Sequence, residues 1–272
     1  MTVEAAAERI SILGVPVSIV DMHGAVESLG RWLRAVRSPG AASPYICACD
    51  VSNVMRAQSD AQHMRALRHA DMILADGTPL AWVSRLRGER RTGRVPGPDF
   101  LSAVCERSLR EGWSHYFYGG ADGIAGRLGE VLTRDYPGIN IAGSASPPFR
   151  TPTKDEIERD LAHINASGAD IVWVGLGCPK QEIWMLEHRA RLEGRVLVGV
   201  GAAFDFHSGR IERAPPWMRE RGLEWLYRLL AEPRRLWHRY LVLAPGFVAL
   251  SLAEAAAEYG RRLVTQGRAS LR

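Results

Sequence analysis

The stretch DIVWVGLGCPKQEIWMLEHRARLEGRVLVGVGAAFDF, at residues 170–206, decides the fold. Its first apolar run, at 170–176, is rich in β-branched and aromatic residues, which favours a buried strand. A glycine turn and Pro179 then lead into a helical pattern over 179–192, and a second apolar run follows at 195–206. A strand, a helix and a second strand in this order predict a parallel β-α-β unit.

The same alternation continues toward the N-terminus. A β pair is expected around Gly14, at 11–20. Further strands are expected at 44–50, 71–76, 115–119 and 139–143, and helices at 22–36, 51–68, 78–87, 98–111, 123–134 and 154–167. This order predicts an α/β fold with a mostly parallel sheet and crossover helices.

The excess positive charge of the chain lies at its C-terminal end. Residues 208–272 hold 12 arginines and six glutamates, a formal charge of +6, whereas residues 1–207 carry −1. Prolines punctuate this region, so we place a boundary near His207. We expect an α/β core over 1–207 and a helical, Arg/Trp-rich appendage over 208–272 that meets an anionic partner.

Composition and cysteine spacing exclude several classes of protein. With 46% apolar and 24% charged residues the chain is globular. Its four cysteines form no CxxC pair, so we expect neither a disulfide framework nor a zinc site, and we expect a cytoplasmic location. No DxD pair, HExxH motif or clustered His/Cys set is present in the sequence, so we expect no metal.

Membrane-directed segments are also not expected. Residues 1–14 lack the basic and apolar regions of a signal peptide. The apolar stretch Leu241–Ala253 is too short to span a bilayer, and Pro245-Gly246 is expected to break it.

Ligands of such folds bind at the carboxyl ends of the strands. The residues there are rich in Gly and Asp, which allow a backbone to approach a nucleotide and accept hydrogen bonds from its hydroxyls. They are Asp50, Asp76-Gly77, Gly119-Gly120, 175–177 and the region from Gly199 to Asp205.

Asp76 and Arg94 are candidates for chemistry. In ADGTPLAW (75–82), Thr78 is the natural N-cap before Pro79, which leaves the Asp76 carboxylate free. Asp76 is then either a turn residue or a general base. Arg94, in GRVPGPDF, is either a solvated arginine or a clamp on phosphate or on developing negative charge.

Three further positions have weaker signals. Gly119-Gly120 could bring backbone N–H groups to a phosphate, although YFYGGADG is not a dinucleotide fingerprint. Gln181 would face the strand ends from the first turn of its helix, or be solvated there. Asp205 would accept a hydrogen bond from a ribose or sugar hydroxyl, or begin a turn.

The appendage contains an amphipathic helical stripe between Trp217 and Ala231. It could pack on its own domain or lie on an anionic bilayer. Nucleic acid is not expected as a partner, because no recognised nucleic-acid module is present. The oligomeric state stays open, a homo-oligomer included.

Seven segments in a fixed order resemble the WecG/TagA/CpsF family of bacterial glycosyltransferases, glycosyltransferase family 26. They are DMILADGTPLAW, RVPGPDF, HYFYGG, DIVWVGLGCPKQE, GVGAAFDFHSG, RAPPWMRERGLEWLYRLLAEPRR and HRYL. The resemblance covers roughly residues 10–243 and includes both the core and the appendage.

The resemblance implies a Rossmann-like fold and an inverting, metal-independent transfer of a sugar from a UDP-sugar to a polyprenyl-diphosphate-linked saccharide. It implies work at the cytoplasmic membrane face in cell-surface polysaccharide synthesis. It places the base on Asp76, a pocket arginine on Arg94 and the glutamine of the PKQE motif on Gln181. The implied UDP contacts are Val200 and Asp205, and the implied closing arginines are Arg219 or Arg221, Arg228 and Arg235.

One departure concerns the end of the second strand. Many members of the family carry Thr-x-Asn where this chain has Ala48-Cys49-Asp50. The donor sugar therefore stays open among N-acetylmannosamine, glucose and uronic-acid types. A nucleotide-cofactor (NAD-type) oxidoreductase and a non-catalytic UDP-sugar-binding membrane scaffold are the alternatives.

Overall fold

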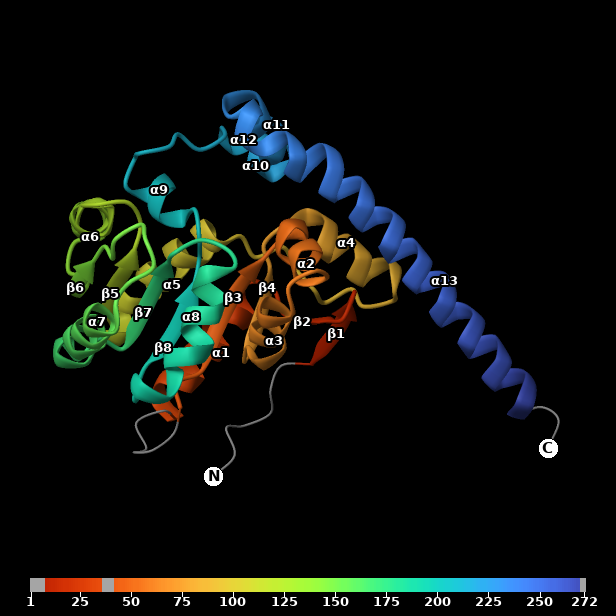
Figure 1. Ribbon diagram of the computed structural model, residues 1–272, viewed down its shortest axis with the longest axis horizontal. Helices are drawn as coiled ribbons and strands as arrows, with labels where there is room; N and C mark the ends of the chain where they lie inside the picture. The colour runs from red at the N-terminus through yellow and green to blue at the C-terminus, as the bar shows by residue number, and fades with distance from the viewer. Residues whose placement is uncertain (1–7, 36–41, 270–272) are drawn as a thin grey trace.

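The centre of the protein is a six-stranded, all-parallel sheet with the order β4-β3-β8-β7-β5-β6 (Figure 1). The computed structural model describes residues 8–35 and 42–269, with side chains up to residue 257. The strands are β3 (Tyr45–Cys49), β4 (Met72–Ala75), β5 (Ser114–Gly119), β6 (Asn140–Ala145), β7 (Ile171–Gly175) and β8 (Val196–Gly199). The α/β fold with a parallel sheet is thereby confirmed.

Helices cover both faces of the sheet and create two apolar cores. Helices α1 (Met22–Ala35), α5 (Gly97–Glu111), α6 (Ile124–Asp135) and α9 (Ala203–His207) contribute to one core. The other core takes residues from α2 (Val51–Ala57), α3 (Ala61–His69), α4 (Thr78–Leu86), α7 (Lys154–Ser167) and α8 (Lys180–His188). Alternate residues of β3 face opposite cores, so Ile46 lies in the first core, and Cys47 and Cys49 lie in the second.

An antiparallel hairpin precedes the sheet, as expected around Gly14. Its strands are β1 (Arg9–Ile12) and β2 (Val15–Ser18). Leu13 and Gly14 form the two-residue turn with φ values of 49° and 79°, which the right-handed twist of a hairpin favours. Ile12, Val15 and Val17 bury this hairpin in the second core.

Two predicted elements are shorter than expected. The helix expected over 51–68 is divided, because the Asp60 side chain accepts a hydrogen bond from the His63 amide and caps a new helix, α3. The strand expected over 195–206 ends at Gly199. Gly201 then turns with φ 52°, and the apolar residues that follow form α9, so Asp205 lies in a helix rather than at a strand end.

The appendage follows α9 and is helical, as expected. It comprises α10 (Pro216–Glu220), α11 (Glu224–Ala231), α12 (Pro233–Trp237), a π-helical segment (His238–Leu243) and α13 (Ala244–Ala269). In Figure 1, α10, α11 and α12 gather beyond α2 and α4, and α13 extends away from them as a long rod.

The expected break at Pro245-Gly246 is wrong. Helical structure continues without interruption from α12 through α13. Proline in a helix removes an amide donor and crowds the preceding turn, and here the wider turn of the π-helical segment directly precedes it. The helical stretch Pro233–Ala257 is therefore 25 residues long and contains an 18-residue window with a mean hydropathy of 1.6, which by length and composition alone is enough to cross a membrane.

One side of this long helix is attached to the core. Phe247 is buried in the second core, and Glu254 forms an ion pair with Arg87 at the end of α4. Glu254 also accepts a hydrogen bond from the Leu13 amide in the N-terminal hairpin, at 3.0 Å. The helix therefore lies against the α/β core along part of its length.

Candidate active site

The carboxyl ends of β3 and β4 bring two aspartates together. Asp50 follows β3 and Asp76 follows β4, and the Asp76 amide donates a hydrogen bond to the Cys49 carbonyl at 2.9 Å. A Cβ atom on Gly77 would lie 3.6 Å from the Cβ atom of Asp50, so these two strand ends are in close contact. The structure thus places the candidates Asp50, Asp76 and Gly77 side by side.

The Asp76 carboxylate is held by the N-terminus of α5. Its Oδ1 atom accepts a hydrogen bond from the Gly97 amide at 3.1 Å, and Gly97 is the first residue of α5. Thr78 is not the N-cap that the sequence suggested but the first residue of α4, which carries no side-chain cap. Asp76 is therefore engaged by α5 and does not cap α4.

Burial raises the pKa of Asp76 above its ordinary value, while the Gly97 hydrogen bond lowers it. Glu224 raises the pKa further, and the guanidinium groups of Arg94 and Arg228 lower it. A carboxylate with a raised pKa is a stronger base than an ordinary aspartate. This environment suits a group that must remove a proton from a hydroxyl.

Gly97 is tightly packed against two strand ends. A Cβ atom there would lie 3.2 Å from the Val200 carbonyl oxygen and 3.3 Å from the Ala48 Cβ atom. A larger residue would require these neighbours to shift by a few tenths of an ångström, so glycine suits the close approach of α5 to the ends of β3 and β8. The N-terminus of α5 therefore contacts both the Asp76 carboxylate and the backbone at Val200.

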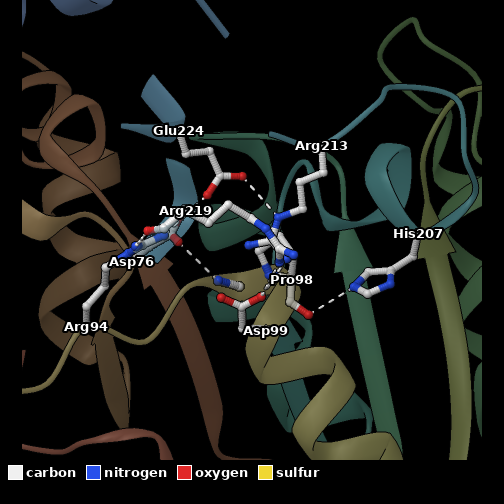
Figure 2. Close-up of polar contacts among 9 residues, drawn as sticks. Asp76, Arg94, Pro98, Asp99, His207, Arg213, Arg219 and Glu224 are labelled. Carbon is white, nitrogen blue, oxygen red and sulfur yellow. Dashed lines mark hydrogen bonds and ion pairs between the residues drawn. The ribbon is translucent and has the colours of Figure 1, made fainter. Parts of the chain in front are cut away.

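Arg94 connects this site to the appendage. It donates one hydrogen bond from Nη1 to the Arg219 carbonyl oxygen at 2.7 Å, and its Nη2 lies 3.3 Å from Oε2 of Glu224 (Figure 2). Its side chain is only 24% exposed. Arg94 is therefore not a solvated arginine: it lies between the strand ends and α11, and its role as a clamp on phosphate stays a prediction.

Three arginines of the appendage lie near the same place, and with Arg94 we call them the arginine cluster: Arg94, Arg213, Arg219 and Arg228. Arg213 pairs with Asp99 in the first turn of α5 and, at 3.0 Å, with Glu224. Arg219 lies 3.8 Å from Asp99. Figure 2 shows the side chains of Arg213 and Arg219 beside Glu224 and Asp99.

The arginine cluster is not fully neutralised. Its four guanidinium groups face three carboxylates, those of Asp76, Asp99 and Glu224. Nη2 of Arg213, Nε of Arg219 and Nε of Arg228 are buried and have no hydrogen-bond partner among the residues that the structure describes. Buried donors without acceptors are rare, so the cluster is suited to an anion that supplies several oxygen acceptors.

Gln181 lies in the first turn of α8, as expected, and contacts the backbone that follows β8. It is 2% exposed, its Oε1 atom accepts a hydrogen bond from the Gly201 amide at 3.1 Å, and its Nε2 atom donates to Glu182 at 2.9 Å. Both polar ends of this side chain are used within the protein. Gln181 therefore shapes the backbone that follows β8 in this arrangement.

Packing explains the two glycines at the end of β5, Gly119 and Gly120. A Cβ atom on Gly119 would lie 2.6 Å from the Gly175 carbonyl carbon, and φ of Gly119 is 129°. The Gly120 amide donates to the Gly175 carbonyl at 2.9 Å, so it is not free for a phosphate here.

Asp205, in α9, pairs with Arg210 at 3.0 Å.

The remaining candidates of the appendage separate into two groups. Arg228 lies 5.3 Å from the ring centroid of Phe206 and acts on the pKa of Asp76, so it belongs to the site. Arg221 is exposed and stacks 5.7 Å from the Trp217 ring, and Arg235 is exposed and pairs with Glu232 in its own helical segment. The structure does not bring Arg221 and Arg235 to Asp76.

Sequence reasoning missed several residues of the site. Arg239 of the π-helical segment pairs with Asp50, and Glu224 bridges Arg94 and Arg213. His207, whose pKa burial lowers, contacts the Pro98 carbonyl oxygen with Nε2 at 2.9 Å (Figure 2). The sequence carries only an indirect signal for these residues. The arginines of the appendage need acidic partners, but the order of residues along the chain does not show which acids these are.

The site is therefore a buried carboxylate and a set of arginines at the carboxyl ends of parallel strands, an arrangement typical of enzymes that act on phosphorylated substrates. A model of the glycosyl transferase WecG/TagA/CpsF family matches residues 10–261. The chain is also similar to the N-acetylglucosaminyldiphosphoundecaprenol N-acetyl-beta-D-mannosaminyltransferase of Bacillus spizizenii. The two are 35% identical over 217 residues, which cover 78% of this chain and 81% of the relative.

The protein is a glycosyltransferase, and it belongs to the WecG/TagA/CpsF family. This membership confirms the resemblance seen in the sequence. It decides against the oxidoreductase, which shares only the general type of sheet, and against a non-catalytic scaffold.

Proposed function

We propose that the protein is an inverting, metal-independent glycosyltransferase that moves a sugar from a UDP-sugar to a polyprenyl-diphosphate-linked saccharide in cell-surface polysaccharide biosynthesis. The observation that carries the proposal is the Asp76 carboxylate beside an incompletely neutralised arginine cluster. The relative from Bacillus spizizenii supports the acceptor, because its name describes transfer of an N-acetylmannosaminyl group to a diphosphoundecaprenol-linked sugar.

In the proposed step, an acceptor hydroxyl attacks the anomeric carbon of the donor on the face opposite to UDP. The Asp76 carboxylate accepts the proton of that hydroxyl. The bond between the anomeric carbon and the diphosphate oxygen breaks, and its electron pair leaves with UDP. Attack from the opposite face inverts the anomeric configuration.

The arginine cluster would stabilise the departing diphosphate. Negative charge develops on the leaving oxygen in the transition state, and guanidinium groups bind phosphate oxygens through two N–H donors at once. Arg213, Arg219 and Arg228 each hold a buried N–H group that lacks an acceptor. Bound diphosphate oxygens would satisfy these donors, and Arg94 would add charge from the core.

The appendage would also place the enzyme on the cytoplasmic face of the membrane. Its exposed apolar side chains include Trp217, Trp225, Leu230, Trp237, Leu241, Val242, Val248, Leu250 and Leu252. Exposed arginines such as Arg221, Arg234 and Arg235 accompany them and would meet anionic headgroups.

Attachment of the long helix to the core favours docking on the surface of the membrane over crossing it. Phe247 and Glu254 hold one side of the helix on the core, and an ion pair with Arg87 would not survive in hydrocarbon. The opposite side carries the apolar residues, including Leu241 and Leu252. We therefore propose peripheral association, with the active site facing the lipid-linked acceptor.

The decisive experiment is a panel of UDP-sugars tested with a short-chain polyprenyl-diphosphate-linked N-acetylglucosamine acceptor. Mass spectrometry of the product identifies the donor, and NMR of the new linkage gives its anomeric configuration. We expect transfer from one donor, with UDP-N-acetylmannosamine tested first and glucose and uronic-acid donors beside it. Transfer with retained configuration would contradict the role given to Asp76, and no transfer from any UDP-sugar would contradict the donor class.

A further inference from the structure

Three side chains with metal-ligating atoms converge between α3 and α8, outside the proposed active site. They are His63 of α3, Cys178 of the loop before α8, and Glu182 of α8. Nε2 of His63 lies 3.8 Å from Sγ of Cys178 and 4.0 Å from Oε2 of Glu182. One ligand atom from each residue lies within 4.8 Å of the other two.

This group is buried and incompletely hydrogen-bonded. The side chains of His63 and Glu182 are fully buried, and Cys178 is half-buried. Oε1 of Glu182 accepts from Gln181, but Oε2 has no hydrogen-bond partner among the described residues, and neither has Nδ1 of His63. A buried carboxylate oxygen without a partner is costly, so the fold holds this atom ready for a ligand.

We propose that Nε2 of His63, the thiolate of Cys178 and Oε2 of Glu182 bind one divalent transition-metal ion, with Zn²⁺ as the best match. Zinc lies about 2.0–2.1 Å from a histidine nitrogen, about 2.3 Å from a cysteine sulfur and about 2.0–2.2 Å from a carboxylate oxygen. Tetrahedral angles then separate the ligand atoms by roughly 3.3–3.6 Å. The observed distances of 3.8 Å and 4.0 Å require contraction by roughly 0.3–0.6 Å, and the sulfur and the carboxylate oxygen, which lie within 4.8 Å of each other, must also approach.

The chemistry of the three ligands selects the ion. A thiolate and an imidazole favour zinc and related metals over Mg²⁺ and Ca²⁺, which prefer all-oxygen sites. The thiolate of Cys178 and the carboxylate of Glu182 carry two negative charges that balance the charge of the ion, so the buried complex is neutral overall. The thiol proton of Cys178 leaves to solvent as the metal–sulfur bond forms.

With these three ligands and a water molecule in the fourth position, the ion would be separate from the transfer reaction. It would join α3 to α8, and Glu182 also accepts the hydrogen bond of Gln181, whose Oε1 atom binds the Gly201 amide. Metal binding would therefore stiffen the backbone that follows β8. This inference does not depend on the proposed donor, acceptor or base.

The test uses the full-length protein, treated with a chelator, dialysed, and titrated with Zn²⁺ alone and with Co²⁺ alone. We expect about one ion per chain by elemental analysis, a higher Tm with metal, and a thiolate-to-cobalt absorption band. His63→Gln, Cys178→Ser and Glu182→Gln should each lose the stoichiometric ion. His69→Gln, an exposed histidine of the same helix, and Cys105→Ser, a buried thiol of the other core, should retain it.

Two outcomes would overturn the proposal. One is a wild-type protein that binds far less than one ion per chain and whose Tm does not change when the metal is added. The other is a Cys178→Ser variant that still binds one ion and shows the cobalt–thiolate band. Because Cys178 is only half-buried, this variant should fold even if Glu182→Gln does not, and circular dichroism checks its fold. We expect Cys178→Ser to retain sugar transfer in the presence of a chelator, because the ion is not part of the transfer reaction.

Discussion

Arg94 of the core and Arg219 of the appendage are joined by a hydrogen bond of 2.7 Å from the Arg94 guanidinium to the Arg219 carbonyl oxygen. The bond ties the loop before α5 to the end of α10, next to the Asp76 carboxylate. A core residue predicted as a phosphate clamp therefore also holds the appendage in place. In the proposed function, the side chain that would bind the diphosphate is therefore the one that holds the appendage.

Removing the carboxylate of Asp76 should remove the base. We expect Asp76→Asn to lower kcat by about 10²–10⁴-fold, the usual contribution of a general base, with a much smaller change in the KM for the donor. Steady-state UDP release with saturating acceptor measures this. Asp122→Asn, an exposed aspartate in the loop after β5, is the matched control and should keep wild-type turnover.

The pH dependence of kcat/KM should report the environment of Asp76. The base acts only when ionised, so activity falls as the pH drops through its pKa. Because burial raises that pKa, the acid limb should lie above the range of an ordinary aspartate, about 3.9. Glu224→Gln removes a charge that raises the pKa and should move the limb to lower pH, whereas Arg228→Gln should move it to higher pH. Opposite shifts would contradict the assignment of this limb to Asp76.

The arginines of the appendage should differ sharply in their effects. Arg228→Gln removes a member of the arginine cluster and should cost about 10²–10³-fold in kcat, as the loss of one transition-state donor does elsewhere. Arg235→Gln should change kcat by less than about twofold, because exposed ion pairs contribute little and Arg235 pairs only with Glu232 among the described residues. Equal effects of the two substitutions would contradict the cluster as the diphosphate site.

Membrane binding should depend on the outer side of the long helix. Leu241→Glu and Leu252→Glu each remove an exposed leucine whose insertion contributes about 1.5–3 kcal/mol, so each should weaken binding to anionic vesicles at least about tenfold. Co-sedimentation with phosphatidylglycerol vesicles measures this. Phe149→Glu, which is 85% exposed in the loop after β6, is the control. If it weakens binding as much, the docking face lies elsewhere.

Gly119 should be essential for stability. Gly119→Ala would place a Cβ atom against the Gly175 backbone at a φ that other residues rarely adopt, so we expect a loss of at least about 2 kcal/mol in the free energy of unfolding. Gly126→Ala in α6 is the contrast, since its Cβ atom would meet only the Ser144 Oγ at 3.8 Å. That variant should be unchanged or more stable by about 0.5–1 kcal/mol. Urea unfolding followed by circular dichroism compares the two.

The sheet could be predicted from the sequence because its strands other than β6 are apolar runs ended by Gly or Asp, and the helices between them have their own periodicity. The end of β8 could not, because the apolar residues of α9 continue the run past Gly199. Only contacts distant in sequence, such as those of Phe204 with Gly120 and Gly175, explain the turn to a helix there.

In the candidate active site, too, some residues could be predicted from the sequence and others could not. Asp76 and Arg94 were identifiable because strand-end acids and loop arginines are recognisable types. Glu224 and Asp99 were not, because their role depends on which arginine the folded appendage brings to them. The group of His63, Cys178 and Glu182 was equally hidden, because His63 and Cys178 are 115 positions apart and no spacing rule connects them.

The unbroken helical backbone from α12 into α13 has a mechanical consequence. Arg239 in its π-helical segment contacts Asp50 at the end of β3, and Leu241, two residues later, faces outward. In the proposed peripheral arrangement, binding of this helix to the bilayer would act directly on the contact between Arg239 and Asp50. We therefore expect faster transfer when anionic vesicles are present than when they are absent.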